Sequence, residues 1–488
     1  MNTLFRIFLG TTPNWYKRGI LLALLINPII AATAGSVAAT WLLVGEFIAI
    51  LALALRCYPL VPGGLLALEA IAIGLASPSQ AYHEVEKNLP TLLLILFMVT
   101  GIYFIRDLLL WAFSRMIIGV KGRVALALAF YFSAAILSMF LDALTVLAAI
   151  VAVATGLEAL HRRAERAVKG RKGAMKPAAA QVELAAFRNF LRSLVMHATL
   201  GTILGGAVTL VGEPQNLLIG AAVGWDFTGY FFANAHVTLP ALVAGGLITW
   251  VIAHKQWLDY GEVLAPASRR LVISALKETA EAGGPARKAR LVAQSAIALL
   301  LVVALALHVA EVGLLGLGII VLAAAVNGTT DEHEIGEAFR GSAPFVALLA
   351  VFFCVVAAIE AQEIFVGLIG AALSLEGSAR EVALYALSGL LSAVSDNVFV
   401  ASSILGEAQR AAAAAGLSAT EMQRLAVAIA NGTNLPAMST PNGTAAMLYL
   451  LTSPIAPALG LSYGKMLKMT APFAIVTTLV GMAAIAGS

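Results

Sequence analysis

Four short polar segments interrupt otherwise apolar stretches of the chain, and each half of the sequence contains two of them. They occupy residues 140–145 and 211–216 in the first half and residues 394–399 and 439–444 in the second half. Broken hydrophobic segments at corresponding positions of two halves are the best sequence indicator of the central site of a secondary transporter. We therefore expect the chemistry of this chain to be the binding and movement of a solute inside a membrane.

The side chains of these segments are rich in oxygen. Carboxylate, carboxamide and hydroxyl oxygens are hard donors, which suit Na⁺ or a similar small cation and not a soft metal. We therefore expect Na⁺ and protons at the breaks, with no transition metal and no cofactor. The candidate ion- and proton-binding residues are Asp142, Thr145, Glu213, Asn216, Asp396, Asn397, Thr440, Asn442 and Thr444.

Charge favours a cation over an anion at these breaks. Asp142, Glu213 and Asp396 lie in the polar segments, and no Arg or Lys accompanies them there. A carboxylate at the membrane centre costs about 3 kcal/mol on insertion scales, so it is retained for pairing, proton relay or ion binding. Burial and a like-charged neighbour both favour the protonated carboxyl, so a cation and a proton would compete for the same groups.

Each of these residues also has a structural interpretation. Asp142 and Asp396 could cap a helix or form an Asx turn at a hairpin tip, and Glu213 could accept a hydrogen bond from the region of Asn216. His197 could sense pH because histidine titrates near neutrality, although a hydrogen-bonded histidine between helices is the commoner finding. We favour the functional interpretation for the two aspartates because each half of the chain has an aspartate at the tip of a predicted hairpin, as described below.

Composition identifies the class of protein. The 488 residues are 60% hydrophobic and 12% charged, whereas about a quarter of the residues of a soluble domain are charged. The formal charge of +4 comes from basic residues in loops between apolar segments, so it reports orientation and not nucleic-acid binding. Two cysteines provide neither a disulfide framework nor a metal motif. No P-loop pattern is present, so we expect no nucleotide and a proton gradient as the energy source.

With about 20 apolar residues as the length of one span, the chain divides into thirteen membrane segments. An amino-terminal run of this kind can be a secretory signal, but an uncleaved first helix is the better interpretation here. The predicted segments are 19–35, 37–55, 62–77, 92–115, 124–156, 193–221, 237–253, 291–309, 312–327, 343–373, 381–410, 422–452 and 467–487.

Two of these segments predict re-entrant hairpins. The segment 124–156 follows Lys121 and Arg123 and precedes the most basic linker, so both its ends should face the cytoplasm. It is too long for one upright helix and too short for two full spans, so its tip should lie near 138–142. The segment 381–410 has the same form without strongly basic flanks, and it should enter from the outside.

Two other segments predict broken helices. Proline removes an amide donor and glycine relaxes the backbone, so the segments 193–221 and 422–452 should unwind where these residues cluster. Unwinding would free backbone carbonyls beside the candidate ligands. The predicted helix-breaking residues are Gly212, Pro214, Pro436, Pro441 and Gly443.

The order of elements predicts internal symmetry. Linkers 157–192 and 254–290 carry nine and seven basic residues and should be cytoplasmic. Counted from a cytoplasmic amino terminus, residues 37–253 and 291–488 contain the same elements in opposite orientation, and the carboxyl terminus falls outside, in the periplasm. The sequence therefore predicts an all-α polytopic membrane protein of two inverted-topology repeats with re-entrant hairpins and broken helices, preceded by an extra helix in residues 1–36.

Several motifs together resemble the NhaB family of bacterial sodium/proton antiporters, within the ion transporter superfamily, and the resemblance runs almost end to end. Any one of the motifs is weak, but the set is specific. The chain departs from the family pattern at two places. Thr444 stands where the family often has Gln, and the residues after Val400 differ. The motifs are Phe8-Leu9-Gly10, Trp15-Tyr16-Lys17, Asn27-Pro28, Phe140 to Val146, Met196-His197-Ala198, Gly212 to Asn216, Ser395 to Val400, Asn431 to Pro436 and Thr440 to Gly443.

The resemblance implies more than the spacing does. Members of the superfamily resemble homodimers in which a scaffold domain forms the dimer interface. A transport domain, made of the two hairpins and the two broken helices, moves across the membrane like an elevator. The family exchanges cytoplasmic Na⁺, and Li⁺, for external protons with net charge movement, in the bacterial inner membrane. An ion transporter superfamily carrier of arsenite, citrate or a dicarboxylate is the alternative, although Ser-Asn-Thr-type tips would be expected there.

Overall fold

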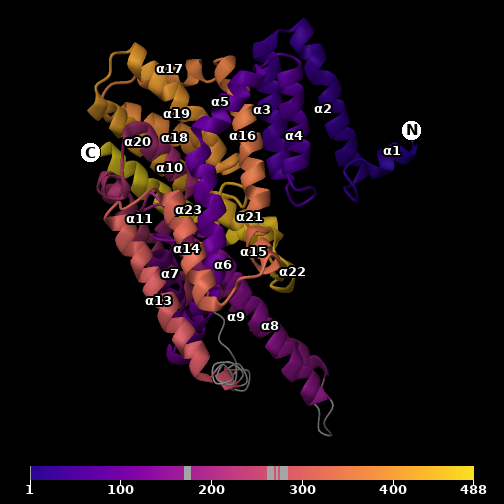
Figure 1. Ribbon diagram of the computed structural model, residues 1–488, viewed down its shortest axis with the longest axis vertical. Coiled ribbons are helices and arrows are strands. Elements are labelled where there is room, and N and C mark those ends of the chain that lie inside the picture. The colour runs from indigo at the N-terminus through magenta and orange to yellow at the C-terminus, as the bar shows by residue number, and fades with distance from the viewer. Residues whose placement is uncertain (1, 170–176, 261–268, 271–272, 275–283) are drawn as a thin grey trace.

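The computed structural model describes residues 2–169, 177–260, 269–270, 273–274 and 284–488, and every regular element within them is a helix (Figure 1). The first half contains α1 (Asn2–Ile7), α2 (Asn14–Thr33), α3 (Ser36–Ala52), α4 (Leu60–Ala72), α5 (Pro78–Lys87), α6 (Leu89–Gly119), α7 (Arg123–Ser138), α8 (Ala143–Lys169), α9 (Pro177–Gly206), α10 (Pro214–Val223) and α11 (Phe227–Lys255).

The second half continues the helical pattern. The predicted membrane segments are helical with shifted ends, but the segment 343–373 is divided into two helices by residues 362–365. Gly170, Arg171, Lys172, Lys176 and Lys277, in the two basic linkers, lie outside the described residues. The elements are α13 (Gly284–Ala306), α14 (Val312–Asn327), α15 (Glu332–Phe339), α16 (Ala343–Ala361), α17 (Val366–Leu373), α18 (Ser378–Val394), α19 (Asn397–Ala414), α20 (Ala419–Asn434), the 3₁₀ helix η1 (Pro436–Ser439), α21 (Ala445–Thr452), α22 (Ile455–Ala458) and α23 (Tyr463–Ala486).

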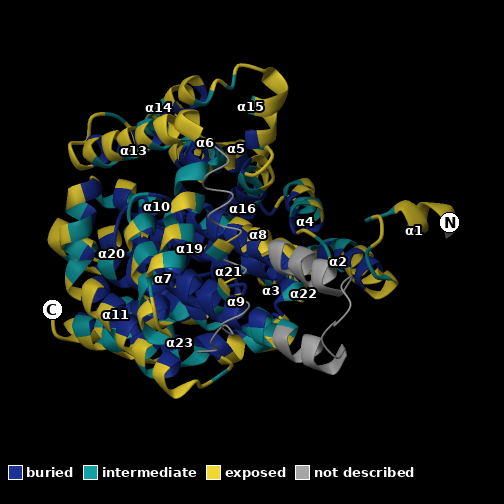
Figure 2. Cartoon of the chain, turned by 90° about the horizontal axis from the view of Figure 1, so that it is seen from below, coloured by how far each residue is buried: buried dark blue, intermediate teal, exposed yellow. Residues whose placement is uncertain are grey.

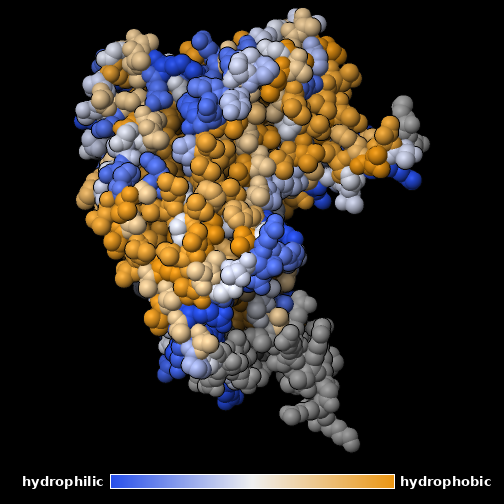
Figure 3. All heavy atoms as spheres, in the orientation of Figure 1, coloured by the Kyte–Doolittle hydropathy of each residue, from blue (hydrophilic) through white to orange (hydrophobic). Residues whose placement is uncertain are grey.

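The molecule has the surface of a membrane protein. Within the described residues, six helices are long and apolar enough to cross a membrane, namely α2, α6, α11, α13, α16 and α23. Figure 3 shows apolar side chains over the middle of the molecule and hydrophilic side chains at its upper and lower ends. An apolar belt between two polar ends is what a bilayer requires, and the chain is a multi-pass membrane protein.

Both predicted hairpins contain a break at the predicted position. The first is made of α7 and α8, which are separated by residues 139–142. The second is made of α18 and α19, which are separated by Ser395 and Asp396. In each hairpin the aspartate is the last residue before the second helix begins.

Both predicted broken helices are also interrupted. α9 ends at Gly206, and α10 begins at Pro214. Proline is favoured in the first helical turn, where its missing N–H has no partner to lose. In the second half α20 ends at Asn434, Pro436 starts η1, and Pro441 lies in the non-helical residues 440–444.

A contact between a hairpin and the last long helix occurs once in each half. The hydroxyl of Tyr131 on α7 donates a 2.8 Å hydrogen bond to the carbonyl of Leu242 on α11. The hydroxyl of Tyr385 on α18 donates a 3.1 Å hydrogen bond to the carbonyl of Thr478 on α23. These buried tyrosines fix the first arm of each hairpin to a long helix beside it.

Two short helices that the sequence analysis did not foresee precede α6 and α16. α5 packs against α16, and α15 packs against α6. α5 begins with a capping box in which Ser77 and Gln80 exchange backbone and side-chain hydrogen bonds of 3.2 and 2.8 Å. At α15 the Asp331 carboxylate accepts the His333 N–H over 2.8 Å. Caps of this kind start a helix in an otherwise polar connection.

The hairpin tips and broken helices lie in the interior. All residues from 190 to 216 and from 395 to 408 are buried. Figure 2 shows buried residues concentrated around α9, α19 and α21, and exposed residues on outer helices such as α13 and α14. Non-helical backbone is tolerated at membrane depth when protein surrounds it, and this arrangement meets that condition.

Candidate ion-binding site

The aspartates at the two hairpin tips cap the helices that follow them. Oδ1 of Asp142 accepts the N–H groups of Leu144 and Thr145 over 2.9 and 3.3 Å. Oδ1 of Asp396 accepts those of Val398 and Phe399 over 2.9 and 3.3 Å. The side chains are 2% and 5% exposed. The capping interpretation is therefore confirmed, but it engages the same single oxygen of each carboxylate and leaves Oδ2 for another role.

Glu213 connects the two tips. It occupies the N-cap position of α10 but makes no capping hydrogen bond with its side chain. The residue is 1% exposed, and its Oε1 has no hydrogen-bond partner among the described residues. It lies close enough to Asp142 and Asp396 to interact electrostatically with both. The structure thus brings together the three carboxylates that the sequence selected, from α8, α10 and α19.

Asn397 lies beside this group. It is the first residue of α19 and is fully buried. It is close enough to Glu213 to affect that carboxylate, but in the described part of the chain neither its amide nitrogen nor its amide oxygen has a hydrogen-bond partner of normal geometry. A buried amide left unpaired costs about 1–3 kcal/mol, so Asn397 is suited to binding a ligand.

Further unpaired oxygens lie nearby. Oγ of Ser138, at the end of α7, has no hydrogen-bond partner in the part of the chain that the structure describes. This oxygen and Cγ of Glu213 lie 3.2 and 3.1 Å from the position that a Cβ on Gly206 would occupy, so they are neighbours. Oε1 of Gln215 is also buried and unpaired. These hard oxygens beside three carboxylates suit Na⁺, and here Na⁺ would be the transported substrate.

Asn216 belongs to a network of amides between α10 and α20. Its nitrogen donates to the carbonyls of Gly206 and Thr209 over 3.0 and 2.8 Å. Its oxygen accepts the amide of Asn434 over 2.8 Å, and the oxygen of Asn434 accepts the amide of Gln215 over 2.8 Å. The side chain of Asn216 therefore holds the break in shape, and Gln215 and Asn434 are site residues that sequence reasoning missed.

A threonine fastens each break to a hairpin. The hydroxyl of Thr440 donates to the carbonyl of Ala393 over 2.6 Å. The hydroxyl of Thr209, which the sequence analysis did not select, donates to the carbonyl of Met139 over 2.6 Å. Thr440 therefore binds the backbone of the adjacent hairpin, and its hydroxyl proton is already used in this hydrogen bond.

Glycines also allow each break to lie close to the adjacent hairpin. A Cβ on Gly212 would lie 2.4 Å from the Gly206 carbonyl oxygen and 2.7 Å from that of Ser138. A Cβ on Gly443 would lie 2.1 Å from the carbonyl oxygen of Ala437 and 2.8 Å from that of Ser392. No side chain fits at either place, so these two predicted breaks require glycine.

The other three candidate residues each make a different contact. Thr145 donates its hydroxyl to Oδ2 of Asp142 over 2.5 Å. Asn442 lies with Asp396 along one cavity. Thr444 caps α21 by accepting the N–H of Met447 over 3.3 Å.

His197 does not join the carboxylates. It lies on α9, nine residues before the helix ends, and its ring is 4.4 Å from the ring of Tyr260. The residue is fully buried, and within the described residues neither ring nitrogen has a hydrogen-bond partner. The hydrogen bond expected of an interhelical histidine is therefore missing, and pH sensing by His197 remains a prediction.

The chain is similar to known proteins over nearly its whole length. The family model for "Bacterial Na+/H+ antiporter B (NhaB)" matches residues 1–487. The chain is 45% identical over 481 residues to the Na(+)/H(+) antiporter NhaB of Marinomonas sp. (strain MWYL1), covering 97% of this chain and 96% of the relative. It is 48% identical over 486 residues to that of Marinobacter nauticus, covering 97% and 96%. The chain belongs to the NhaB family of bacterial Na⁺/H⁺ antiporters.

Proposed function

We propose that this protein exports cytoplasmic Na⁺, and Li⁺, in exchange for external protons, with net movement of charge. The observation that carries the proposal is the meeting of Asp142, Glu213 and Asp396. No lysine or arginine of the described residues is among the groups that act on these three carboxylates. Negative charge without a basic partner attracts either a cation or a proton, so each should displace the other.

We also propose alternating access by an elevator movement of two inverted repeats, 37–253 and 291–488, linked by 254–290. The recurrence of the tyrosine contact, the threonine fastening and the glycine approach in both halves supports this. The moving domain would contain the hairpins 124–156 and 381–410 and the broken helices 193–221 and 422–452. Scaffold helices such as α6 and α14, which pack together, would hold the interface of a homodimer.

An anion carrier of the same superfamily is less compatible with the site. A site for citrate, a dicarboxylate or arsenite would need hydrogen-bond donors or positive charge, whereas this site offers carboxylates. The orientation that we propose places the amino terminus in the cytoplasm and the carboxyl terminus in the periplasm of the inner membrane.

The proposal can be tested in everted membrane vesicles from a host that lacks its own antiporters. A pH-sensitive dye reports the proton gradient, and Na⁺, Li⁺, K⁺, citrate and arsenite are added in turn. We expect Na⁺ and Li⁺ to dissipate the gradient and the anions to have no effect. Dissipation by citrate or arsenite, and none by Na⁺, would favour the anion carrier instead.

A further inference from the structure

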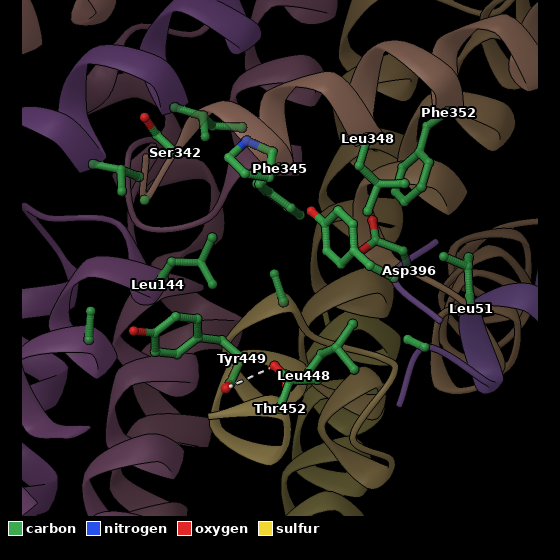
Figure 4. A pocket seen from close by; sticks show the side chains of 18 of the residues that line it. Leu51, Leu144, Ser342, Phe345, Leu348, Phe352, Asp396, Leu448, Tyr449 and Thr452 are labelled. Carbon is green, nitrogen blue, oxygen red and sulfur yellow. Dashed lines mark hydrogen bonds between the residues drawn. The ribbon is translucent and has the colours of Figure 1, made fainter. Parts of the chain in front are cut away.

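A cavity of about 340 Å³ lies between two groups of helices. One wall comes from α3, α6 and α16, and the other comes from α8, α21 and Asp396, which directly precedes α19. Figure 4 shows Asp396 beside Leu348 and Phe352 on one side and Leu144, Tyr449 and Thr452 across the space. The cavity is large enough for several water molecules, and its walls are mainly apolar.

Of the three central carboxylates, Asp396 alone lines this cavity. Its Oδ1 caps α19, and within the described residues its Oδ2 accepts no hydrogen bond. Asn442 lines the same space, and the phenol of Tyr58, which also lines it, is close enough to Asp396 to interact electrostatically. Asp396 thus presents a free oxygen to a space that solvent can enter.

Asp142 is placed differently, although it holds the equivalent position in the other hairpin. Both its oxygens are engaged, Oδ1 by backbone N–H groups and Oδ2 by the Thr145 hydroxyl. It does not line the cavity, and its neighbour Leu144 does. An ion in the cavity would therefore meet Asp396 before it could reach Asp142.

The cavity is lined partly by residues next to the connection between α14 and α16. Gly341 and Ser342, just before α16, and Thr452, at the end of α21, line it. Arg340 directly precedes Gly341 in the chain. α15 and α22, which are their neighbours along the chain, lie at a similar height in Figure 1. In the orientation that we propose, which rests on the basic linkers 157–192 and 254–290, the connection between α14 and α16 faces the cytoplasm.

We propose that this cavity is the cytoplasmic access path and that Asp396, with Asn442 beside it, is the first binding position for Na⁺. The inference rests on the proposed antiport. Apart from a few hydroxyl groups the walls are apolar, so the first carboxylate that an entering cation meets is Asp396 at the hairpin tip. Transfer to Glu213 and Asp142 follows, and a released proton leaves by the same route.

Cysteine labelling tests the path. In a Cys57→Ser/Cys354→Ser parent, single cysteines are placed at Ala445 and Thr452, which line the cavity, and at Ala446, which is fully buried and does not. A membrane-impermeant methanethiosulfonate is applied to everted and to right-side-out vesicles. We expect Ala445→Cys and Thr452→Cys to react only in everted vesicles, and Ala446→Cys to react in neither.

Sodium protection tests the first binding position. We expect Na⁺ to slow labelling of Ala445→Cys at least severalfold and to leave Thr452→Cys unchanged. Adding Asp396→Asn should abolish this protection, whereas adding Asp142→Asn should preserve part of it. Labelling from the outside, or equal loss of protection in both variants, would overturn the inference.

The same vesicles separate the two proposals. Exchange is measured in the cysteine-free parent before labelling. Active exchange with an unreactive Ala445→Cys would refute this path and leave the antiport intact. No Na⁺-dependent exchange in the parent or the unaltered protein would count against the antiport itself, while the sidedness of labelling would still decide whether the cavity opens to the cytoplasm.

Discussion

The hydroxyl of Thr145 donates a 2.5 Å hydrogen bond to Oδ2 of Asp142. Three residues after Asp396, the corresponding position is occupied by Phe399, whose side chain has no donor. The two hairpin tips therefore share a cap and differ in the second carboxylate oxygen. This difference gives the two aspartates distinct environments within one site.

Replacing either tip aspartate by asparagine separates its charge from its capping role. Asparagine caps a helix about as well as aspartate, so Asp142→Asn and Asp396→Asn should fold and insert normally. We expect Na⁺-dependent exchange in vesicles to fall by more than about tenfold, equivalent to 1.4 kcal/mol, because the variant lacks the negative charge for which Na⁺ and the proton compete. Asp226→Asn, at the exposed cap of α11, is the matched control and should retain exchange. Near-normal affinity and rate in both tip variants would reduce these residues to caps.

Thr145→Val tests the hydrogen bond that distinguishes Asp142. The variant keeps the shape of the side chain and removes the donor that stabilises the charged carboxylate. A hydrogen bond to a charged group is worth about 1.5–3 kcal/mol, so the half-saturating Na⁺ concentration should rise roughly tenfold or more. Thr145→Ser keeps the hydroxyl and should remain close to the unaltered protein. Equal affinities for the Val and Ser variants would exclude a role for this hydroxyl.

The sequence predicted the helical segments and their breaks because the signals are local. Apolar runs mark the spans, and glycine, proline and the tip aspartates mark the interruptions at Asp142, Asp396, Pro214 and Pro441. The meeting of the carboxylates also followed from the repeated pattern. The capping box of Ser77 and Gln80 is an equally local signal for the start of α5.

What the sequence could not predict depends on contacts between distant segments. Gln215 and Asn434 form one amide network although they are 219 residues apart. Thr209 resembles any threonine near a helix end, and its role appears only when the carbonyl of Met139 lies 2.6 Å away. The asymmetry between the two aspartates likewise depends on which helices border the cavity.

Glu213→Gln should change the pH dependence of Na⁺ binding. For a shared site, the half-saturating Na⁺ concentration should rise as pH falls, because protons occupy the carboxylates. Glutamine removes a negative charge beside Asp142 and Asp396, which then hold protons less tightly. The rise should therefore begin at a lower pH in the variant. Dye measurements across a pH series check this, with exposed Glu376→Gln as the control. A Na⁺ requirement independent of pH would contradict the shared site.

The two hairpins should open to opposite sides of the membrane. Gly122 and Gly377 lie next to their first arms, but both have positive φ, where a cysteine would be strained. Cysteines are better placed at the exposed neighbours Lys121 and Glu376. We expect an impermeant thiol reagent to label Lys121→Cys from the cytoplasm and Glu376→Cys from the periplasm. Labelling of both from one side would contradict the inverted repeat.

Gly406 allows a contact between α16 and the second hairpin. A Cβ there would lie 2.3 Å from Oε1 of Glu360, whose Oε2 is held 3.2 Å from Arg410, which in turn lies 2.7 Å from the buried Glu407. Glu360 therefore cannot move aside without leaving its ion pair, so Gly406→Ala should destabilise the protein by about 1–3 kcal/mol.

At a second glycine, replacement by alanine should have the opposite effect on stability. Gly370, in α17, has open space where its Cβ would be. Gly370→Ala should be neutral or stabilise by up to about 1 kcal/mol, because alanine restricts the unfolded chain. Thermal unfolding of both variants in detergent measures the difference, and Gly406→Ala should have the lower midpoint. Stabilisation of the two variants by the same amount would mean that Glu360 relaxes freely, and that its pairing with Arg410 does not hold α16 against the hairpin.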